Sequence, residues 1–114
     1  MPESLTVEQV DGTRPGHTVL RLRGPITVQN LFPFQTAERE SRGSSLILEM
    51  TGVPYIDSVG VGALVGAYVS RNKEGRRVAL VGLGQRVNAS LAISNLTQFF
   101  PTFPTIEAAE QSLG

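Results

Sequence analysis

The first quarter of the chain alternates between apolar and polar residues in two short segments. Residues 5–10 (LTVEQV) and residues 17–23 (HTVLRLR) both show the two-residue period of a β-strand. The residues between them (DGTRPG) are rich in turn formers, so we expect a loop there. Gly24-Pro25 ends the second segment, since proline cannot donate a hydrogen bond to a ladder. The two segments are therefore predicted to pair as an antiparallel hairpin.

Two later segments are almost continuously apolar, which is typical of strands covered on both faces. They are residues 45–50 (SLILEM) and residues 77–82 (RVALVG). Residues 59–73 lie between them and have helical spacing, and Gly75 ends that helix. The apolar stripe of the helix consists of Val61, Leu64, Val65, Tyr68 and Val69. A strand, a helix and a strand within about 40 residues predict a parallel, right-handed crossover unit.

Another helix is predicted within residues 28–41, after the hairpin. Thr27 is a candidate N-cap, but Pro33 lies in the path of the helix, and an interior proline costs about 3 kcal/mol. Proline is tolerated in the first turn, so we expect the helix to begin near Phe32. Its core-facing residues would be Leu31, Phe34 and Ala37.

Two helices follow the last buried strand, over residues 85–94 and 106–113. The candidate core residues of the first are Val87, Leu91 and Ile93. The order of the elements predicts an α/β fold, with a mixed four- to five-stranded sheet, an N-terminal antiparallel pair and helices packed mainly on one face. No linker or repeat interrupts this order, so we expect residues 1–114 to form a single domain.

Composition excludes several functional classes. Ten basic and ten acidic residues cancel, so no overall field attracts nucleic acid or an anionic membrane. Cysteine is absent, and the single histidine, His17, is expected to be a strand or surface residue. No catalytic set, metal site or cofactor motif emerges, so an enzyme is the least favoured class. Three arginines near the end of one predicted helix, Arg71, Arg76 and Arg77, are expected to be solvated rather than to form a basic patch.

The ends and the apolar stretches of the chain give an expectation about location and self-association. The N-terminus shows no signal-peptide pattern, and the longest mostly apolar stretch, residues 59–69, is too short to span a bilayer. A cytoplasmic location is the default expectation. An apolar cluster near the C-terminus consists of Leu96, Phe99, Phe100, Phe103 and Ile106. We expect it to close the core, and the alternative is a patch for a weak homodimer or another partner.

The most informative residues lie where the first buried strand passes to its helix. Asp57 and Ser58 are both good N-cap residues. If Ser58 is the cap, its hydroxyl lies near the backbone N–H groups of Gly60 and Val61. The positive end of the helix dipole would stabilise an added phosphate there. The alternative, judged from the residues alone, is that Ser58 only caps the helix.

The predicted helix contains three glycines, whose presence requires an explanation: Gly60, Gly62 and Gly66. Each costs up to about 1 kcal/mol relative to alanine in a helix interior. Gly60 is expected to keep the surroundings of Ser58 accessible. Gly62 and Gly66, followed by Ser70, form a stripe of small residues. That stripe either receives another backbone from outside or packs closely within the protein.

The segment from Leu46 to Leu64 resembles the core of a STAS domain, as found in bacterial anti-sigma factor antagonists. The family pattern is a hydrophobic strand, an aromatic-hydrophobic-Asp-Ser-small-Gly turn and a helix. The turn here is Tyr55-Ile56-Asp57-Ser58-Val59-Gly60. Residues 75–81 are similar to the family's last core strand, and the likeness runs from about residue 5 to residue 113.

The resemblance implies a protein–protein switch without a cofactor. In phosphorylated family members, the serine after the turn's aspartate is modified by an anti-sigma factor that is also a Ser/Thr kinase, and this abolishes binding. Carried over, Ser58 is the phospho-acceptor. A phosphate adds about −1.5 to −2 charges, which disrupts a packed interface by repulsion and desolvation. The implied partner-binding residues are Thr27, Tyr55, Asp57, Ser58, Val59, Gly60, Val61 and Gly62.

One departure from the family pattern bears on partner recognition. The family's first loop commonly reads Gly-x-Leu/Ile-Asp and uses the acid at the partner surface, whereas this chain has Thr27 in that place. Thr27 favours an alternative function, that of a STAS adaptor that is not phosphorylated and that binds a transporter or another protein. The intact Asp57-Ser58 pair favours the phosphorylation switch.

Overall fold

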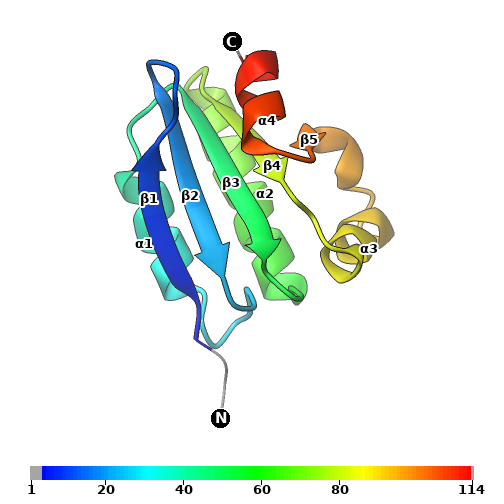
Figure 1. Ribbon diagram of the computed structural model, residues 1–114. Coiled ribbons are helices and arrows are strands. Elements are labelled where there is room, and N and C mark those ends of the chain that lie inside the picture. Colours follow the sequence, from blue (N-terminus) through cyan, green and yellow to red (C-terminus); the bar gives the residue numbers. More distant parts are fainter. Residues whose placement is uncertain (1–3, 114) are drawn as a thin grey trace.

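A mixed five-stranded β-sheet organises residues 4–113, the part of the chain that the computed structural model describes (Figure 1). The strands are β1 (Thr6–Asp11), β2 (His17–Arg23), β3 (Ser45–Gly52), β4 (Arg77–Val81) and β5 (Thr102–Phe103), side by side in that order. β1 pairs antiparallel with β2, and each later pair of neighbours is parallel. The predicted α/β fold with an antiparallel pair at its start is confirmed.

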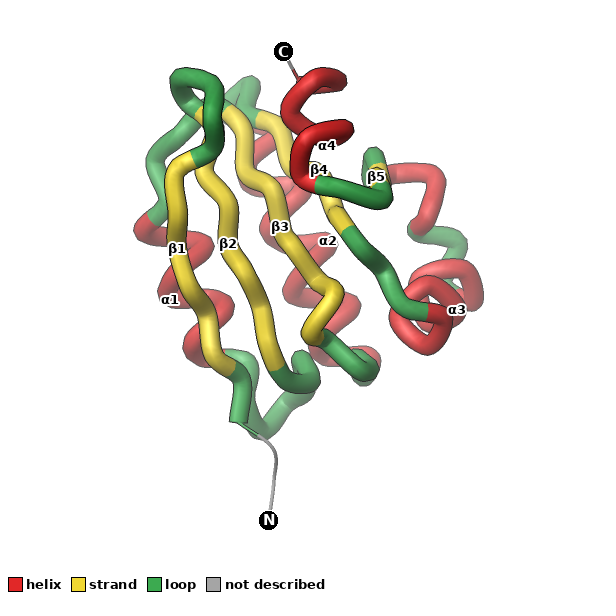
Figure 2. The backbone as a smooth tube through the Cα atoms, viewed as in Figure 1, coloured by secondary structure: helices red, strands yellow, loops and turns green. Residues whose placement is uncertain are grey.

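Helices cover both faces of this sheet unequally. They are α1 (Phe32–Glu40), α2 (Ser58–Lys73), α3 (Gln85–Ile93), a 3₁₀-helix (Thr97–Phe99) and α4 (Ile106–Leu113). α1 and α2 lie behind the sheet in Figure 2, and α4 lies in front of it. The larger core lies between the sheet and α1, α2 and α3, and a smaller one lies beneath α4. The prediction that the helices pack mainly on one face therefore holds.

Side chains of the central strands alternate between the two cores. The larger core contains Leu20, Leu22, Leu46, Leu48, Met50 and Leu80. The smaller core contains Val19, Ile47, Ala79 and Val81, packed with Ala109 of α4. Burial on both faces explains the nearly continuous apolar runs in these strands. None of the helices in the described part of the chain combines the length and the hydropathy that a bilayer span requires.

Some details of the core differ from the sequence predictions. Ile93 is the last residue of α3 and is 84% exposed, so its assignment to the core is wrong. Val69 is 44% exposed because the buried face of α2 runs along a different set of residues. That set is Gly60, Val61, Leu64, Ala67 and Arg71. β5 and the 3₁₀-helix were not predicted, since elements of two or three residues have no detectable periodicity.

The apolar cluster near the C-terminus is divided between core and surface. Phe100 is buried, and its ring meets the ring of Tyr68 edge-on, with centroids 5.4 Å apart. Phe99 is 47% exposed and lines an apolar pocket of about 180 Å³. The cluster therefore closes the core through Phe100, and self-association through the exposed part stays a prediction.

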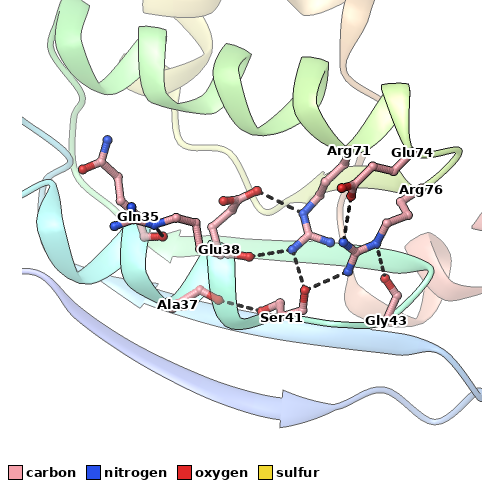
Figure 3. A network of polar contacts seen from close by, with 9 residues as sticks. Gln35, Ala37, Glu38, Ser41, Gly43, Arg71, Glu74 and Arg76 are labelled. Atoms are coloured by element: carbon pink, nitrogen blue, oxygen red, sulfur yellow. Dashed lines mark hydrogen bonds and ion pairs between the residues drawn. The ribbon is translucent and has the colours of Figure 1, made fainter.

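Two arginines join the ends of α1 and α2 (Figure 3). The buried guanidinium of Arg71 donates to the Glu38 carboxylate at 3.1 Å and to the backbone oxygens of Glu38 and Ser41 at 2.6 and 3.0 Å. Arg76 also donates to the Ser41 oxygen, at 2.7 Å, and to that of Gly43, at 2.9 Å. Burial, together with the charge of Arg76, lowers the pKa of Arg71 against the opposing effect of Glu38. The expectation that Arg71 is solvated is wrong, because it bonds helix-end carbonyls that lack partners within α1.

A second buried polar group attaches α4 to the β1–β2 hairpin. The Glu110 carboxylate accepts hydrogen bonds from Thr13 Oγ1 at 3.0 Å, Arg14 N at 3.1 Å and His17 Nδ1 at 3.0 Å. Gly12 leaves room for it, because a Cβ there would lie 2.6 Å from Glu110 Oε1. Burial acts to raise the pKa of Glu110, but the hydrogen bonds outweigh it and the pKa is lowered. His17 is a buried strand residue with a structural partner.

Candidate functional site

The pairing of two loops builds the candidate site at the carboxyl ends of β2 and β3. Ile26 and Ile56 form an isolated parallel bridge. The Ile26 amide donates to the Tyr55 oxygen at 3.3 Å, and the Asp57 amide donates to the Ile26 oxygen at 3.2 Å. The chain then enters α2 at Ser58. The carboxyl ends of parallel strands are the usual place for binding residues in an open α/β sheet.

Asp57 stabilises the pairing of the two loops through both of its carboxylate oxygens. Oδ1 accepts from the Gly60 amide at 2.8 Å, which makes Asp57 the N-cap of α2. Oδ2 accepts from the Val28 amide at 3.0 Å and thereby fixes the neighbouring loop. The Val61 amide also donates to the backbone oxygen of Asp57 at 2.9 Å. One aspartate thus caps the helix and joins the two loops.

Ser58 is the first residue of α2, so of the two candidate N-caps Asp57 is the one that caps the helix. Asp57 has the extended backbone that a capping residue needs, with φ −98° and ψ −176°. The Ser58 side chain is exposed and forms no hydrogen bond within residues 4–113. The amides of Gly60 and Val61, expected to face an added phosphate, are already bonded to Asp57. Ser58 therefore presents a free hydroxyl beside a helix start that is already capped.

Thr27 belongs to a closed local turn and does not cap α1. Its amide and hydroxyl donate to Asn30 Oδ1 at 2.7 and 3.1 Å, and the Asn30 amide donates to the Thr27 oxygen at 3.1 Å. α1 begins later, at Phe32, with no side-chain cap and with Pro33 in its first turn. Thr27 therefore lies beside the turn, as the resemblance implies, and makes the first loop neutral where the family commonly has an acid.

The structure decides the roles of the glycines of α2, and that of Gly60 differs from the prediction. A Cβ on Gly60 would lie 2.2 Å from the Ile26 oxygen, so this glycine allows close packing rather than access. Gly62 and Gly66 are exposed, and a Cβ on either would meet nothing within 4 Å. Close packing within the protein is therefore excluded for these two, and they form open surface.

A groove of about 400 Å³ runs along this open surface between α1 and α2. Its lining is part apolar and part polar, and consists of Leu31, Phe34, Gln35, Glu38, Arg39, Val59, Gly62, Ala63, Gly66 and Ala67. Three of the six exposed large apolar residues of the described chain lie in the loop before α1 or at the starts of α1 and α2. They are Val28 (65% exposed), Phe32 (70%) and Val59 (41%). Apolar surface gathered in this way is typical of a protein-binding face.

Arg86, which the sequence analysis missed, borders the site on the side of α3. It is exposed in the first turn of α3, and its Cζ lies 4.8 Å from the centroid of the Tyr55 ring. The three loops at this edge, residues 24–31, 52–57 and 82–84, contain one charged residue, Asp57. No sequence pattern could have identified Arg86, because its contact joins the first turn of α3 to a loop 31 positions earlier (86 − 55). Among residues 4–113 no cluster of three potential metal ligands occurs.

Comparison with known proteins places this geometry in a family. The family model of the STAS domain matches residues 6–109. The chain belongs to the STAS domain family. Among curated proteins none matches the sequence.

Solved structures share the STAS fold at low sequence identity. An anti-sigma factor antagonist from Mycobacterium paratuberculosis has a TM-score of 0.83 and 22% identity, over 95% of this chain and 92% of that one. The anti-sigma factor antagonist SpoIIAA of Bacillus, in its unphosphorylated form, has a TM-score of 0.75 and 20% identity, over 96% and 97%. The murine anion transporter Slc26a9 has a TM-score of 0.75 and 20% identity, over 96% of this chain but 22% of that one. At these identities the likeness establishes the fold alone.

Proposed function

We propose that this STAS domain is a cytoplasmic anti-sigma factor antagonist that binds a kinase-type anti-sigma factor and is released by phosphorylation at Ser58. The observation that carries the proposal is the exposed, unbonded Ser58 hydroxyl at the start of α2. A kinase can reach this hydroxyl without unfolding the turn, because Asp57 and not Ser58 caps the helix. The low-identity likeness to anti-sigma factor antagonists supports the same function.

The surface around Ser58 explains how phosphorylation would end binding. Val28, Phe32 and Val59 offer apolar contact area, and the groove beside Gly62 and Gly66 lets another backbone approach. A phosphate at the edge of this surface would have to be desolvated on binding, and burial of an unpaired charge is strongly unfavourable. The Gly60 and Val61 amides cannot offset this, since both are bonded to Asp57.

Transfer of phosphate from candidate kinase-type anti-sigma factors tests the proposal. The full chain is incubated with each candidate and ATP, and the modified residue is mapped by mass spectrometry. We expect modification at Ser58 that disappears in Ser58→Ala and persists in Ser70→Ala, a matched exposed serine of the same helix. Affinity for the candidate should fall at least about 100-fold after phosphorylation, a loss of about 2.7 kcal/mol. Modification of another residue, or undiminished binding after modification, would contradict the proposal.

A second function is favoured by Thr27. Its hydroxyl is bonded within its own turn, so the loop presents no acid to a partner. This neutral loop fits a STAS adaptor that docks on a transporter or another protein through α2 without being phosphorylated. Stable binding to such a partner, unaffected by Ser58→Glu and without phosphate transfer from any candidate kinase, would favour the adaptor over the antagonist.

A further inference from the structure

Arg86 is a cation without an anionic partner beside the proposed phosphorylation site. Its guanidinium lies over the Tyr55 ring, with Cζ 4.8 Å from the centroid, and it forms no ion pair within the described part of the chain. The carboxylate of Asp57, the one acid in the three adjoining loops, is bonded to two backbone amides. Arg86 therefore carries a positive charge at the edge of the site, in contact with the neutral Tyr55 ring and with no carboxylate paired to it in the described part of the chain.

Tyr55, the residue on which the Arg86 guanidinium lies, precedes Ser58 by three positions in the same turn. Tyr55 to Asp57 is extended, since this segment pairs with Ile26 on one side. Three residues of extended chain span at most about 10 Å, which limits the separation of the Tyr55 and Ser58 backbones. The guanidinium over Tyr55 is exposed, and α3 holds only its backbone. The movement required of Arg86 is therefore a rotation about its own side-chain bonds, with its backbone staying in α3.

We infer that Arg86 is the receptor for the phosphate of phosphorylated Ser58, and that it leaves the Tyr55 ring to bind it. This inference rests on the proposed function. An arginine held on an aromatic face at an exposed site is weakly bound, whereas a guanidinium binds phosphate through paired, charge-assisted hydrogen bonds. The phosphate is thus the stronger partner, and it cannot recruit the Gly60 amide that Asp57 already occupies.

Movement of Arg86 from the Tyr55 ring to the phosphate would alter the binding surface at two places. Phosphate at Ser58 changes the charge beside the α1–α2 groove, and the departure of Arg86 uncovers the ring of Tyr55 on the side of α3. A partner that contacts both sides of the turn would therefore detect phosphorylation through the position of Arg86 as well as through the phosphate. Arg86→Gln should weaken this effect and leave Ser58 available for modification.

Nuclear magnetic resonance on the full chain, with phosphoserine inserted at position 58 during translation, tests the inference. The ³¹P signal gives the second pKa of the phosphate, which for free phosphoserine is about 6. We expect this pKa to be lower by at least about 0.5 in the chain with Arg86 than in Arg86→Gln, because a contacting cation favours the dianion. Arg77→Gln removes an exposed arginine at the other end of the parallel strands and should leave the pKa unchanged.

A second signal reports the movement itself. In the unmodified protein, ring currents of Tyr55 should displace the side-chain proton shifts of Arg86, and phosphorylation should abolish this displacement. An equal phosphate pKa in the parent and Arg86→Gln chains would overturn the inference, and so would persistence of the ring-current displacement. Since the phosphate is inserted without a kinase, failure here is distinct from failure of the transfer assay. Arg86→Lys keeps the positive charge but lacks the planar fork of the guanidinium. The pKa of the phosphate in this variant should therefore lie between those of the parent and Arg86→Gln chains.

Discussion

Both carboxylate oxygens of Asp57 are occupied by backbone amides, those of Val28 and Gly60. Asp57 therefore stabilises the turn, whereas the Ser58 hydroxyl stays free to react. From the sequence, either residue could cap α2, because serine and aspartate have similar capping preferences. Only the backbone conformation, extended at Asp57 and helical from Ser58, decides between them.

Gly60 and Gly62 offer a comparison within one helix, because alanine should have opposite effects at the two positions. Gly60→Ala should lower the free energy of unfolding by about 2 kcal/mol or more, since its Cβ would lie 2.2 Å from the Ile26 oxygen. Gly62→Ala should raise it by up to about 1 kcal/mol, because alanine is the better helix former and its Cβ meets nothing. Urea denaturation monitored by circular dichroism measures both. Equal changes in the free energy of unfolding for the two variants would show that the Ile26 oxygen does not exclude a side chain at Gly60.

Arg71 is the buried guanidinium at the ends where α1 and α2 are joined, and Arg76 supplements it there. The groove between the two helices includes the exposed glycines Gly62 and Gly66 in its lining. The two helices that line the groove are thus fixed to each other at one end, where Arg71 donates hydrogen bonds to backbone oxygens at the end of α1. This arrangement is a structural reason why the groove persists as open surface.

Loss of the Arg71 guanidinium should destabilise the fold far more than loss of an exposed cation on the same helix. Arg71→Met leaves the Glu38 carboxylate and two backbone oxygens without these donors, and we expect a loss of about 3 kcal/mol in the free energy of unfolding. Lys73→Met, an exposed change in the last turn of α2, should alter it by less than about 0.5 kcal/mol. Thermal and urea unfolding provide the measurement, and similar losses for the two variants would contradict the role given to Arg71.

The elements were predictable from sequence to the extent that each carries its own periodicity. The central strands and α2 followed from apolar runs and helical spacing, and Pro33 located the start of α1 at Phe32. The burial of Arg71 was not predictable, because it depends on the end of α1 lying against α2. Arg86 was missed for the same reason, since it lies on α3 and its partner Tyr55 lies on a loop far from it in the sequence. Contacts between elements, unlike the elements themselves, leave no local pattern.

At the level of the whole molecule, α4 closes the face of the sheet opposite the candidate site. The apolar contact of Ala109 with the central strands is accompanied by one buried acid, Glu110, that reaches the β1–β2 hairpin. The last helix is thereby joined to the first two strands, so the N- and C-terminal parts of the domain are stabilised together. The helices α1 and α2, through which we propose that a partner binds, lie on the other side of the sheet, where binding need not disturb this closure.

Acid should weaken this closure through Glu110. Its pKa in the folded protein lies below its ordinary value, so its contribution to stability is fully present above the unfolded-state pKa of about 4.3 and is lost as the pH falls through the folded-state pKa. Glu110→Gln should lower the free energy of unfolding at pH 7 by about 1–3 kcal/mol and flatten its decline below about pH 4. Glu107→Gln, at an exposed position of α4, should change neither. Urea unfolding from pH 3 to pH 7 measures both effects. If Glu110→Gln kept the parent's full acid dependence, other carboxylates would have to account for it, and the attachment of α4 through Glu110 would not control the acid stability of the domain.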